Sequence, residues 1–161
     1  MAGRIRFDGH VEAGVGMARE ILRRLRFSND ETEQIEALVA NHMRFKDLGN
    51  MRESTLKRFL RLPRFEEHLE LHRIDCLSAS GNLENYELAA AKLRELPEEQ
   101  LKPRPLLTGK ELIAAGYEPG PAFSRMLAAA EDAQLEGRIQ SAAEALDLVR
   151  EQFGPPPQAG R

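Results

Sequence analysis

Apolar residues recur at helical spacing along most of this chain. Near its start an apolar residue appears every three or four positions, which places the set on one face of a helix; the set is Val11, Val15, Ala18, Leu22 and Leu25. Similar patterns predict a helix after Ser28, helices over about 54–62, 64–80 and 83–96, and three more beyond residue 107. Because no segment reads as a convincing strand, we expect an all-α protein.

Several of the predicted helices carry start and stop signals. Three starts have Ser or Thr followed three residues later by Glu, a pair that satisfies backbone N–H groups reciprocally: Ser28 with Glu31, Thr108 with Glu111, and Ser141 with Glu144. Pro121 stands where a first-turn proline is favoured, and Gly81 where glycine ends a helix. Gly14 and Gly16 interrupt the first helix, and we expect them to let another backbone approach closely.

Prolines divide the predicted helices into two groups. Residues 97–107 hold three of the nine prolines, and Leu106 and Leu107 indicate that this joint packs against the protein. The predicted organisation is a helical body over 1–96, the joint over 97–107, a three-helix tail over 108–153 and a disordered end over 154–161.

The composition fits a soluble helical protein. The 161 residues carry a net charge of −3, no tryptophan and 6% aromatics, so we expect a core of Leu, Ile, Val, Ala and Met. No apolar run reaches membrane-spanning length, and the N-terminus does not resemble a signal peptide. Cys76 is the only cysteine and is expected to be a small core residue. These features predict a cytoplasmic protein without a membrane partner.

One stretch is strongly basic although the chain is acidic overall. Between residues 44 and 64, seven basic residues are opposed only by Asp47 and Glu53, which gives a local charge of 7 − 2 = +5. Such clustering is typical of phosphate binding, although surface helices are also charged for structural reasons. Lys57, Arg61 and Arg64 follow i, i+4, i+7 spacing and predict a stripe. The candidate RNA-binding residues are Arg44, Lys46, Lys57, Arg58, Arg61 and Arg64, to which Arg23, Arg24 and Arg26 could add.

A second candidate site for phosphate lies at the helix start near residue 120. Gly120 allows close backbone approach, and a helix N-terminus offers free N–H groups and the positive end of the dipole. Lys110 and Arg125 lie near it in sequence. The structural alternative is a tight helix–turn–helix joint.

The histidines are candidates for metal chemistry. His68, His72 and Asp75 share a helix face at a spacing that can chelate a divalent ion, but the glutamate of the H-E-x-x-H pattern is missing. His42 lies on an otherwise apolar face, where a hydrogen-bonded core histidine is the commonest case. No phosphate-binding loop or nucleophile motif occurs, so we do not expect a complete enzyme.

Five segments form a series from about Gly3 to Val149: GRIRFDGHVEAG, LRFSNDETEQIEALVANHMRF, STLKRFLRLPRFEEHLELHRIDCL, LLTGKELIAAGYEPGPAFSRML and DAQLEGRI. In this order they resemble the C-terminal half of bacterial CCA-adding tRNA nucleotidyltransferases and related poly(A) polymerases. The chain departs from that family at Val11, where an acidic residue is usual, and at 78–80, where Ser-Ala-Ser replaces Ala-Ser-His.

The resemblance implies a parent enzyme of three parts. An N-terminal head binds Mg²⁺ through carboxylates and transfers nucleotides, a neck selects the base, and a helical body and tail hold tRNA. Head and neck motifs are not found here, so the resemblance implies a body and tail with no catalytic residue and no cofactor of its own. Its implied partners are tRNA or another structured RNA and the catalytic head, but not DNA.

The body is also similar to HD-type phosphohydrolase domains, whose ligands follow the order His, His-Asp, His, His, Asp. His10, His42 and Asp75 match the later members, while the first His and the His-Asp pair would lie before Met1. We therefore interpret these three residues as vestigial and expect no bound metal. The expected fold is an all-α helical bundle, with a truncated HD-like subdomain followed by a small three-helix tail.

Two other functions stay open at this point. The first is a metal-dependent phosphohydrolase fragment of the HD type, which a metal assay would reveal. The second is a helical protein-interaction scaffold, which would lack salt-dependent tRNA binding.

Overall fold

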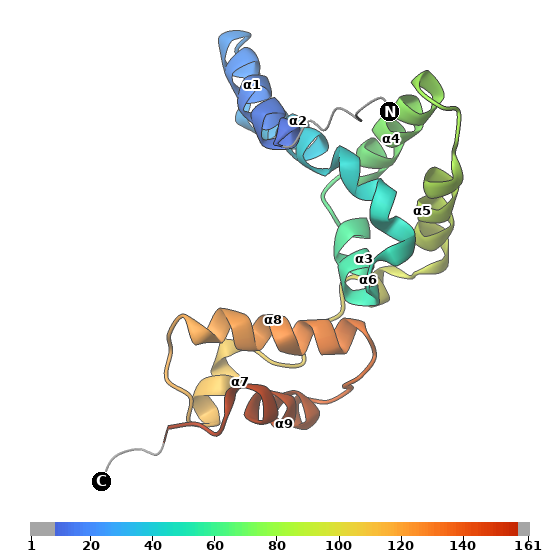
Figure 1. Ribbon diagram of the computed structural model, residues 1–161. Coiled ribbons are helices and arrows are strands. Elements are labelled where there is room, and N and C mark those ends of the chain that lie inside the picture. Colours follow the sequence, from blue (N-terminus) through green and yellow to red (C-terminus); the bar gives the residue numbers. More distant parts are fainter. Residues whose placement is uncertain (1–8, 158–161) are drawn as a thin grey trace, which may run out of the picture. The chain divides into compact units, whose positions relative to one another are not determined.

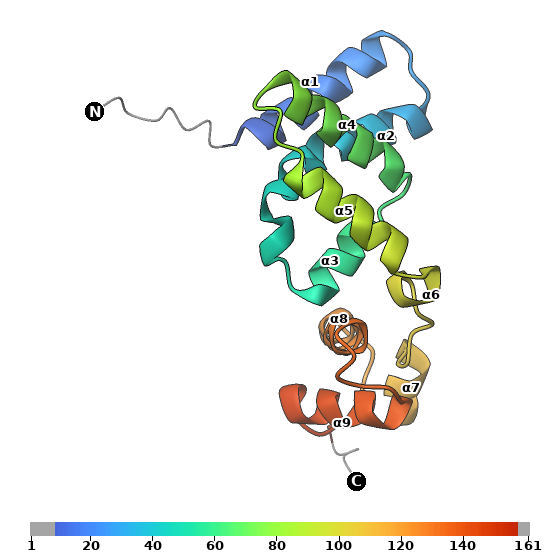
Figure 2. The same ribbon diagram turned by 90° about the vertical axis from the view of Figure 1, so that its right-hand side faces the viewer.

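A computed structural model describes residues 9–157, and all regular structure within them is helical (Figures 1 and 2). Contacts divide these residues into two units. Unit 1 comprises 9–50 and 62–92, and unit 2 comprises 51–61 and 93–157. No helix of the described part is long and apolar enough to cross a membrane. The all-α prediction is confirmed.

Unit 1 holds four α-helices and a 3₁₀ helix: α1 (His10–Arg24), α2 (Asn29–Asn41), η1 (His42–Asn50), α4 (Phe65–Ser78) and most of α5 (Glu84–Glu95). Unit 2 holds α3 (Glu53–Leu60), α6 (Glu98–Leu101), α7 (Gly109–Ala114), α8 (Ala122–Leu135) and α9 (Ala142–Phe153). The helical body predicted over residues 1–96 includes the residues of α3. In the structure α3 packs against α6 and α8, so it groups with the C-terminal helices.

The helix starts follow their capping signals closely. Ser28 and Thr108 form complete capping boxes with Glu31 and Glu111. The third box is only half formed: Ser141 accepts from the backbone N–H of Glu144, whose carboxylate accepts instead from the N–H of Gln140 at 2.6 Å. At the end of α4, Gly81 has a φ of 73° and donates to the Cys76 carbonyl at 2.7 Å, as a terminating glycine should.

The α1–α2 hairpin shows why one of the two α1 glycines is needed (Figure 1). A Cβ on Gly14 would lie only 3.3 Å from Val39 Cγ1, so glycine permits close approach to a side chain of α2. Nothing lies within 4 Å of the same position at Gly16, so the prediction fails there. Leu22 faces the hairpin and is buried, whereas Leu25, predicted on the same face, is 58% exposed.

The core of unit 1 contains aromatic rings in addition to the aliphatic side chains predicted from composition, which are represented by Leu22, Leu48 and Ala89. Phe45 and Phe65 are buried with their ring centroids 6.0 Å apart. The His72 ring stacks on Phe45 with 4.2 Å between centroids, and His68 lies beside Phe65. His68 is 2% exposed, and neither of its ring nitrogens has a hydrogen-bond partner among the described residues. Histidine therefore serves here as a flat core side chain.

The core of unit 2 is formed mainly by α7, α8 and α9, where α8 and α9 lie side by side (Figures 1 and 2). It contains small and aliphatic side chains as predicted, together with Tyr117, whose hydroxyl donates to the Gly154 carbonyl at 2.7 Å. Gly154 belongs to the segment predicted to be disordered, but this hydrogen bond holds its carbonyl at the core of unit 2. Residues 158–161 of that segment lie outside the described range. The joint packs as expected, with Leu107 buried.

We expect unit 1 to lose stability as the pH falls below about 6.5. Burial lowers the pKa of His68 and of His72 from 6.5, against the raising effect of Glu67 and Asp75 respectively. The unfolded chain then binds protons that the folded chain does not, so stability present above pH 6.5 is lost as the pH drops. Both histidines should contribute to this loss between pH 7.5 and 5.5, because both have a lowered pKa in the folded chain.

Hydrogen exchange, corrected for intrinsic rates, measures this loss as the opening free energy of α4. All four histidines lie in unit 1, so α9 in unit 2 is an internal control that should keep its opening free energy at both pH values. The variant His68→Phe should show a smaller pH dependence in α4, because one of the two histidines with a lowered pKa is removed. An α4 that opens equally at both pH values would contradict the buried neutral histidines.

Candidate nucleic-acid interface

The basic stretch of residues 44–64 is divided between the two units. Lys57, Arg58 and Arg61 belong to α3 and its end in unit 2, whereas Arg44, Lys46 and Arg64 belong to unit 1. The predicted stripe through Lys57, Arg61 and Arg64 does not form, because α3 ends at Leu60. Arg64 instead has a left-handed backbone with a φ of 50° and precedes α4.

Lys57 is buried, which is unusual for a lysine. Its ammonium donates to the Leu135 carbonyl at 2.6 Å and lies 2.7 Å from a carboxylate oxygen of Glu53. Leu135 is the last residue of α8, where carbonyls have no partner within the helix and the dipole is negative. Lys57 therefore caps the C-terminal end of α8.

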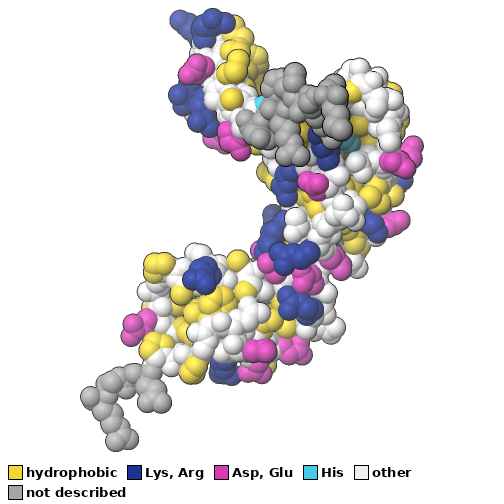
Figure 3. Space-filling view, viewed as in Figure 1, with side chains coloured by type: hydrophobic (Ala, Val, Ile, Leu, Met, Phe, Trp, Pro, Cys, Tyr) yellow, Lys and Arg dark blue, Asp and Glu magenta, His cyan; other side chains and the backbone are white. Residues whose placement is uncertain are grey.

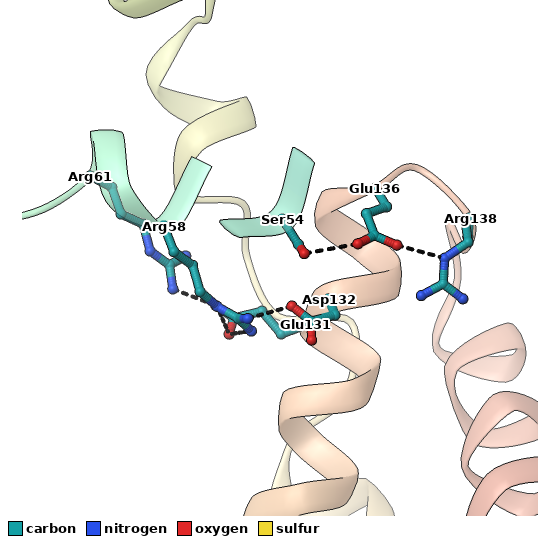
Figure 4. A network of polar contacts seen from close by, with 7 residues as sticks. All are labelled: Ser54, Arg58, Arg61, Glu131, Asp132, Glu136 and Arg138. Carbon is teal, nitrogen blue, oxygen red and sulfur yellow. Dashed lines mark hydrogen bonds and ion pairs between the residues drawn. The ribbon is translucent and has the colours of Figure 1, made fainter. Parts of the chain in front are cut away.

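Arg58 and Arg61 extend this contact along α8 (Figure 4). The Arg58 guanidinium forms ion pairs with both Glu131 and Asp132, and Arg61 donates to the second Glu131 oxygen at 2.6 Å. Nearer the end of α8, the buried Ser54 hydroxyl donates to Glu136 at 2.8 Å. Arg138 donates to the other oxygen of the same carboxylate at 2.9 Å. The cations of α3 thus already have anionic partners within unit 2.

The carboxylates of this network lie on the second half of α8 and directly after it. Burial alone would raise the pKa of the Glu131 carboxyl, but hydrogen bonds from Arg58 and Arg61 outweigh it and lower that pKa. These acidic partners are not among the residues predicted from the sequence. The spacing of Glu131, Asp132 and Glu136 in "EDAQLE" was the available signal, since it places three carboxylates on the second half of a predicted helix.

The basic residues of unit 1 differ in how exposed they are and in how strongly they pair with other groups. Arg44 is half-buried and donates to Asn41 at 3.0 Å, and burial lowers its pKa. Lys46 is exposed at the edge of a cavity of about 570 Å³. Arg64 is 43% exposed and lies 3.4 Å from Asp30. Surface pairs at that distance contribute little free energy, so Arg64 can be recruited by another anion.

The three tail candidates all lie on the surface of unit 2. Lys110 is exposed in the first turn of α7, and Gly120 is exposed just before α8. Gly120 accepts from the Phe123 N–H at 3.0 Å, which is the first hydrogen bond of that helix start. The Arg125 guanidinium lies over the Phe153 ring, 5.7 Å from its centroid, and remains exposed.

The residues matched to the HD-type ligands lie near one another in unit 1. The rings of His10 and His42 meet edge to face with 5.9 Å between centroids. His42 and Asp75 line the same 570 Å³ cavity, with His72 and Cys76 beside them. The Nδ1 of His42 donates to the Val39 carbonyl at 2.6 Å, which leaves Nε2 as its free nitrogen. Half-buried Cys76 has its sulfur 3.5 Å from His72 Nε2.

This arrangement does not amount to a metal centre. Within residues 9–157, no group of three or more His, Cys, Asp or Glu side chains is placed to hold a metal ion. His68 and His72, which share a helix face by spacing, are both used in the aromatic core.

Comparison with known proteins gives a consistent picture. The family model "tRNA nucleotidyltransferase domain 2 putative" matches residues 11–149. The chain is 35% identical over 148 residues to a CC-adding tRNA nucleotidyltransferase of Thermus thermophilus, covering 89% of this chain and 33% of the relative. It is 32% identical over 158 residues to an A-adding tRNA nucleotidyltransferase of Deinococcus radiodurans, covering 92% and 36%.

A third relative, a CC-adding tRNA nucleotidyltransferase of Synechocystis, is 27% identical over 146 residues, which cover 88% of this chain and 34% of the relative. No solved structure matches the chain. The chain thus spans about a third of the length of these curated relatives. Because the family model covers nearly the whole chain, the protein belongs to the tRNA nucleotidyltransferase domain 2 family.

Proposed function

We propose that this chain binds tRNA and positions it for nucleotide addition by a catalytic part that corresponds to the rest of the relatives' length. The observation that carries the proposal is the family match over residues 11–149, which takes in both helical units. The Mg²⁺ ions needed for nucleotide transfer would belong to that catalytic part. A tRNA partner implies work in the cytoplasm.

The contacts within the chain suggest which cations serve RNA. Lys57, Arg58 and Arg61 are held by the carbonyl and carboxylates of α8, so moving them to a phosphate would break existing bonds. Lys46 and Lys110 are exposed. A hydrogen bond from Thr108 and, to a smaller extent, the charge of Lys110 lower the pKa of the neighbouring Glu111 carboxyl, but this holds Lys110 less firmly than the bonds of the α3 cations to α8. We therefore assign the principal phosphate contacts to Lys46 in unit 1 and Lys110 in unit 2.

The remaining candidates have supporting roles in this proposal. Arg64 exchanges a weak pair for a phosphate, Arg44 supports the surface beside Lys46, and Arg125 offers its exposed guanidinium near the α8 start at Gly120. Side chains cannot reach the bases in the deep major groove of A-form RNA. We therefore expect recognition of the tRNA backbone and shape, with little dependence on sequence.

The double variant Lys46→Ala, Lys110→Ala should weaken tRNA binding and flatten its dependence on salt. Each lost phosphate contact reduces counterion release, so the slope of log K against log salt should fall by about one unit per lysine. Titration of purified tRNA at several salt concentrations measures both effects. Arg150→Ala is the matched control, because Arg150 is an exposed cation of α9 paired with Asp147. Equal slopes for the double variant and the wild type would remove these lysines from the interface.

The double variant Arg58→Ala, Arg61→Ala should act on stability instead of RNA affinity. It leaves Glu131 and Asp132 without their cations, and we expect unit 2 to lose about 1–2 kcal/mol of unfolding free energy. The chain has two tyrosines and no tryptophan, and Tyr117 lies in the core of unit 2. In a Tyr86→Phe background, tyrosine fluorescence during urea unfolding therefore reports on unit 2 alone.

Arg150→Ala serves again as the control, since loss of an exposed i, i+3 pair should change stability by less than about 0.5 kcal/mol. If the α3 variant unfolds like the wild type but binds tRNA with a flatter salt dependence, then α3 faces the RNA and the assignment to Lys46 and Lys110 is wrong.

A further inference from the structure

A cavity within unit 2 lies between α8 and a segment that runs from the proline-rich joint to the start of α7. Its volume of about 420 Å³ is in the range of small-ligand sites. We call the space between α8 and residues 103–109 the joint cavity. Hydrophobic side chains also gather on the face of unit 2 seen in Figure 3, beside single Lys and Arg side chains. The walls of the joint cavity are largely apolar, through Pro103, Pro105, Leu107, Leu127 and Ala128.

Gln134 of α8 holds one wall of the joint cavity in place. Its side-chain N–H donates to the Arg104 carbonyl at 2.8 Å, and its side-chain oxygen accepts from the Leu106 N–H at 3.2 Å. The rings of Pro103 and Pro105 fix their own φ angles, so this wall has few other conformations to adopt. Little conformational entropy is therefore lost when a ligand enters the joint cavity.

Basic residues stand at both ends of this wall. Residues 102–110, KPRPLLTGK, contain three basic residues and no acidic one. Arg104 stands between the two prolines, Lys110 directly follows the last residue of the lining, and both are exposed. Among the described residues that line the joint cavity, Glu131 is the one carboxylate, and it is already paired with the arginines of α3 and its end (Figure 4). The charge left at the joint cavity is therefore positive.

Other carboxylates nearby do not remove this charge. Glu98 and Glu99 of α6 line a neighbouring hollow together with Arg104, but among the described residues no ion pair joins either of them to that guanidinium. Glu111 follows Lys110, and its carboxylate accepts hydrogen bonds within the capping box at the start of α7. Arg104 and Lys110 are therefore available to an anion.

A flat apolar group with a negative charge on either side fits the joint cavity. A nucleotide within an RNA strand has this form, because a phosphate stands before and after its base. The base must be unpaired, since a base within a duplex is stacked between its neighbours. Apolar walls accept the faces of any base. Gln134 already uses both ends of its amide on the joint, so it is not free to read the edge of a base.

We propose that the joint cavity takes one unpaired base of bound RNA, and that the phosphates on either side of this base lie against Arg104 and Lys110. The inference rests on the proposed function, because it names the form of RNA that unit 2 holds. It adds a base contact to the phosphate contact of Lys110. The contact depends little on which base enters, in keeping with recognition of backbone and shape.

The test compares the wild-type chain with Ala128→Leu in titrations of purified tRNA and of a fully paired RNA duplex. Ala128 is exposed, and leucine there fills the joint cavity from α8 without changing the charge. We expect tRNA affinity to fall at least about fivefold at every salt concentration, which is the size of one lost base contact. The slope of log K against log salt should stay the same, since no phosphate contact is removed. Affinity for the duplex should not change.

Two further variants control this test. Ser124→Leu fills the joint cavity from the preceding turn of α8 and should lower tRNA affinity in the same way. Ala143→Leu adds the same side chain at an exposed position of α9 outside the cavity lining, and it should bind tRNA like the wild type. All three variants should resist urea as well as the wild type does.

Equal tRNA affinity of the wild type and both cavity variants would overturn the base contact and leave the proposed function standing. Equal loss of affinity for tRNA and duplex would also overturn it, because a paired strand has no base to insert. A wild-type chain that binds neither RNA would overturn the proposed function and the base contact together. In that case, shifts of the Ala128 NMR signals on addition of cytidine monophosphate would assign the joint cavity to a free nucleotide.

Discussion

The docking of α3 on the end of α8 determines which charges of this protein remain available to a ligand. Lys57 satisfies the last carbonyl of α8, and Arg58 and Arg61 neutralise the acidic second half of the same helix. Burying an ammonium is costly unless its hydrogen bonds are replaced, and here a carbonyl and a carboxylate replace them. The same contacts between α3 and α8 place a segment from the middle of the chain in the C-terminal unit. They therefore contribute both to the pairing of the charges and to the grouping of the helices into two units.

The local structure could be predicted from the sequence because local rules fix it. The apolar spacing, the capping boxes at Ser28 and Thr108 and the stop at Gly81 depend only on residues within one or two helical turns. The boundary between the units could not be found in this way. It depends on contacts between α3 and residues more than seventy positions later, such as Arg58 with Glu131.

The surroundings of the candidate site residues could not be predicted from the sequence for the same reason. A local charge of +5 identifies a basic segment, but whether its cations face solvent or carboxylates is a tertiary property. The histidines show the same limit in the core. Their spacing indicated either ordinary polar positions or metal chelation, whereas His68 and His72 stack with two phenylalanines that lie far apart in sequence or on the adjoining turn. Only the resemblance to a known family indicated a function, because it does not depend on knowing which distant residues meet in the fold. The family match confirms that resemblance.

The central claim is that the chain holds tRNA through its exposed lysines while α3 maintains the fold. Photo-crosslinking of bound tRNA, followed by mass spectrometry of the attached peptides, tests this claim most directly. The account predicts crosslinks in the peptides that contain Lys46 and Lys110, and none in the peptide of α3, whose basic residues face α8. Crosslinks concentrated on α3, or the absence of crosslinks from both the Lys46 peptide and the Lys110 peptide, would contradict it.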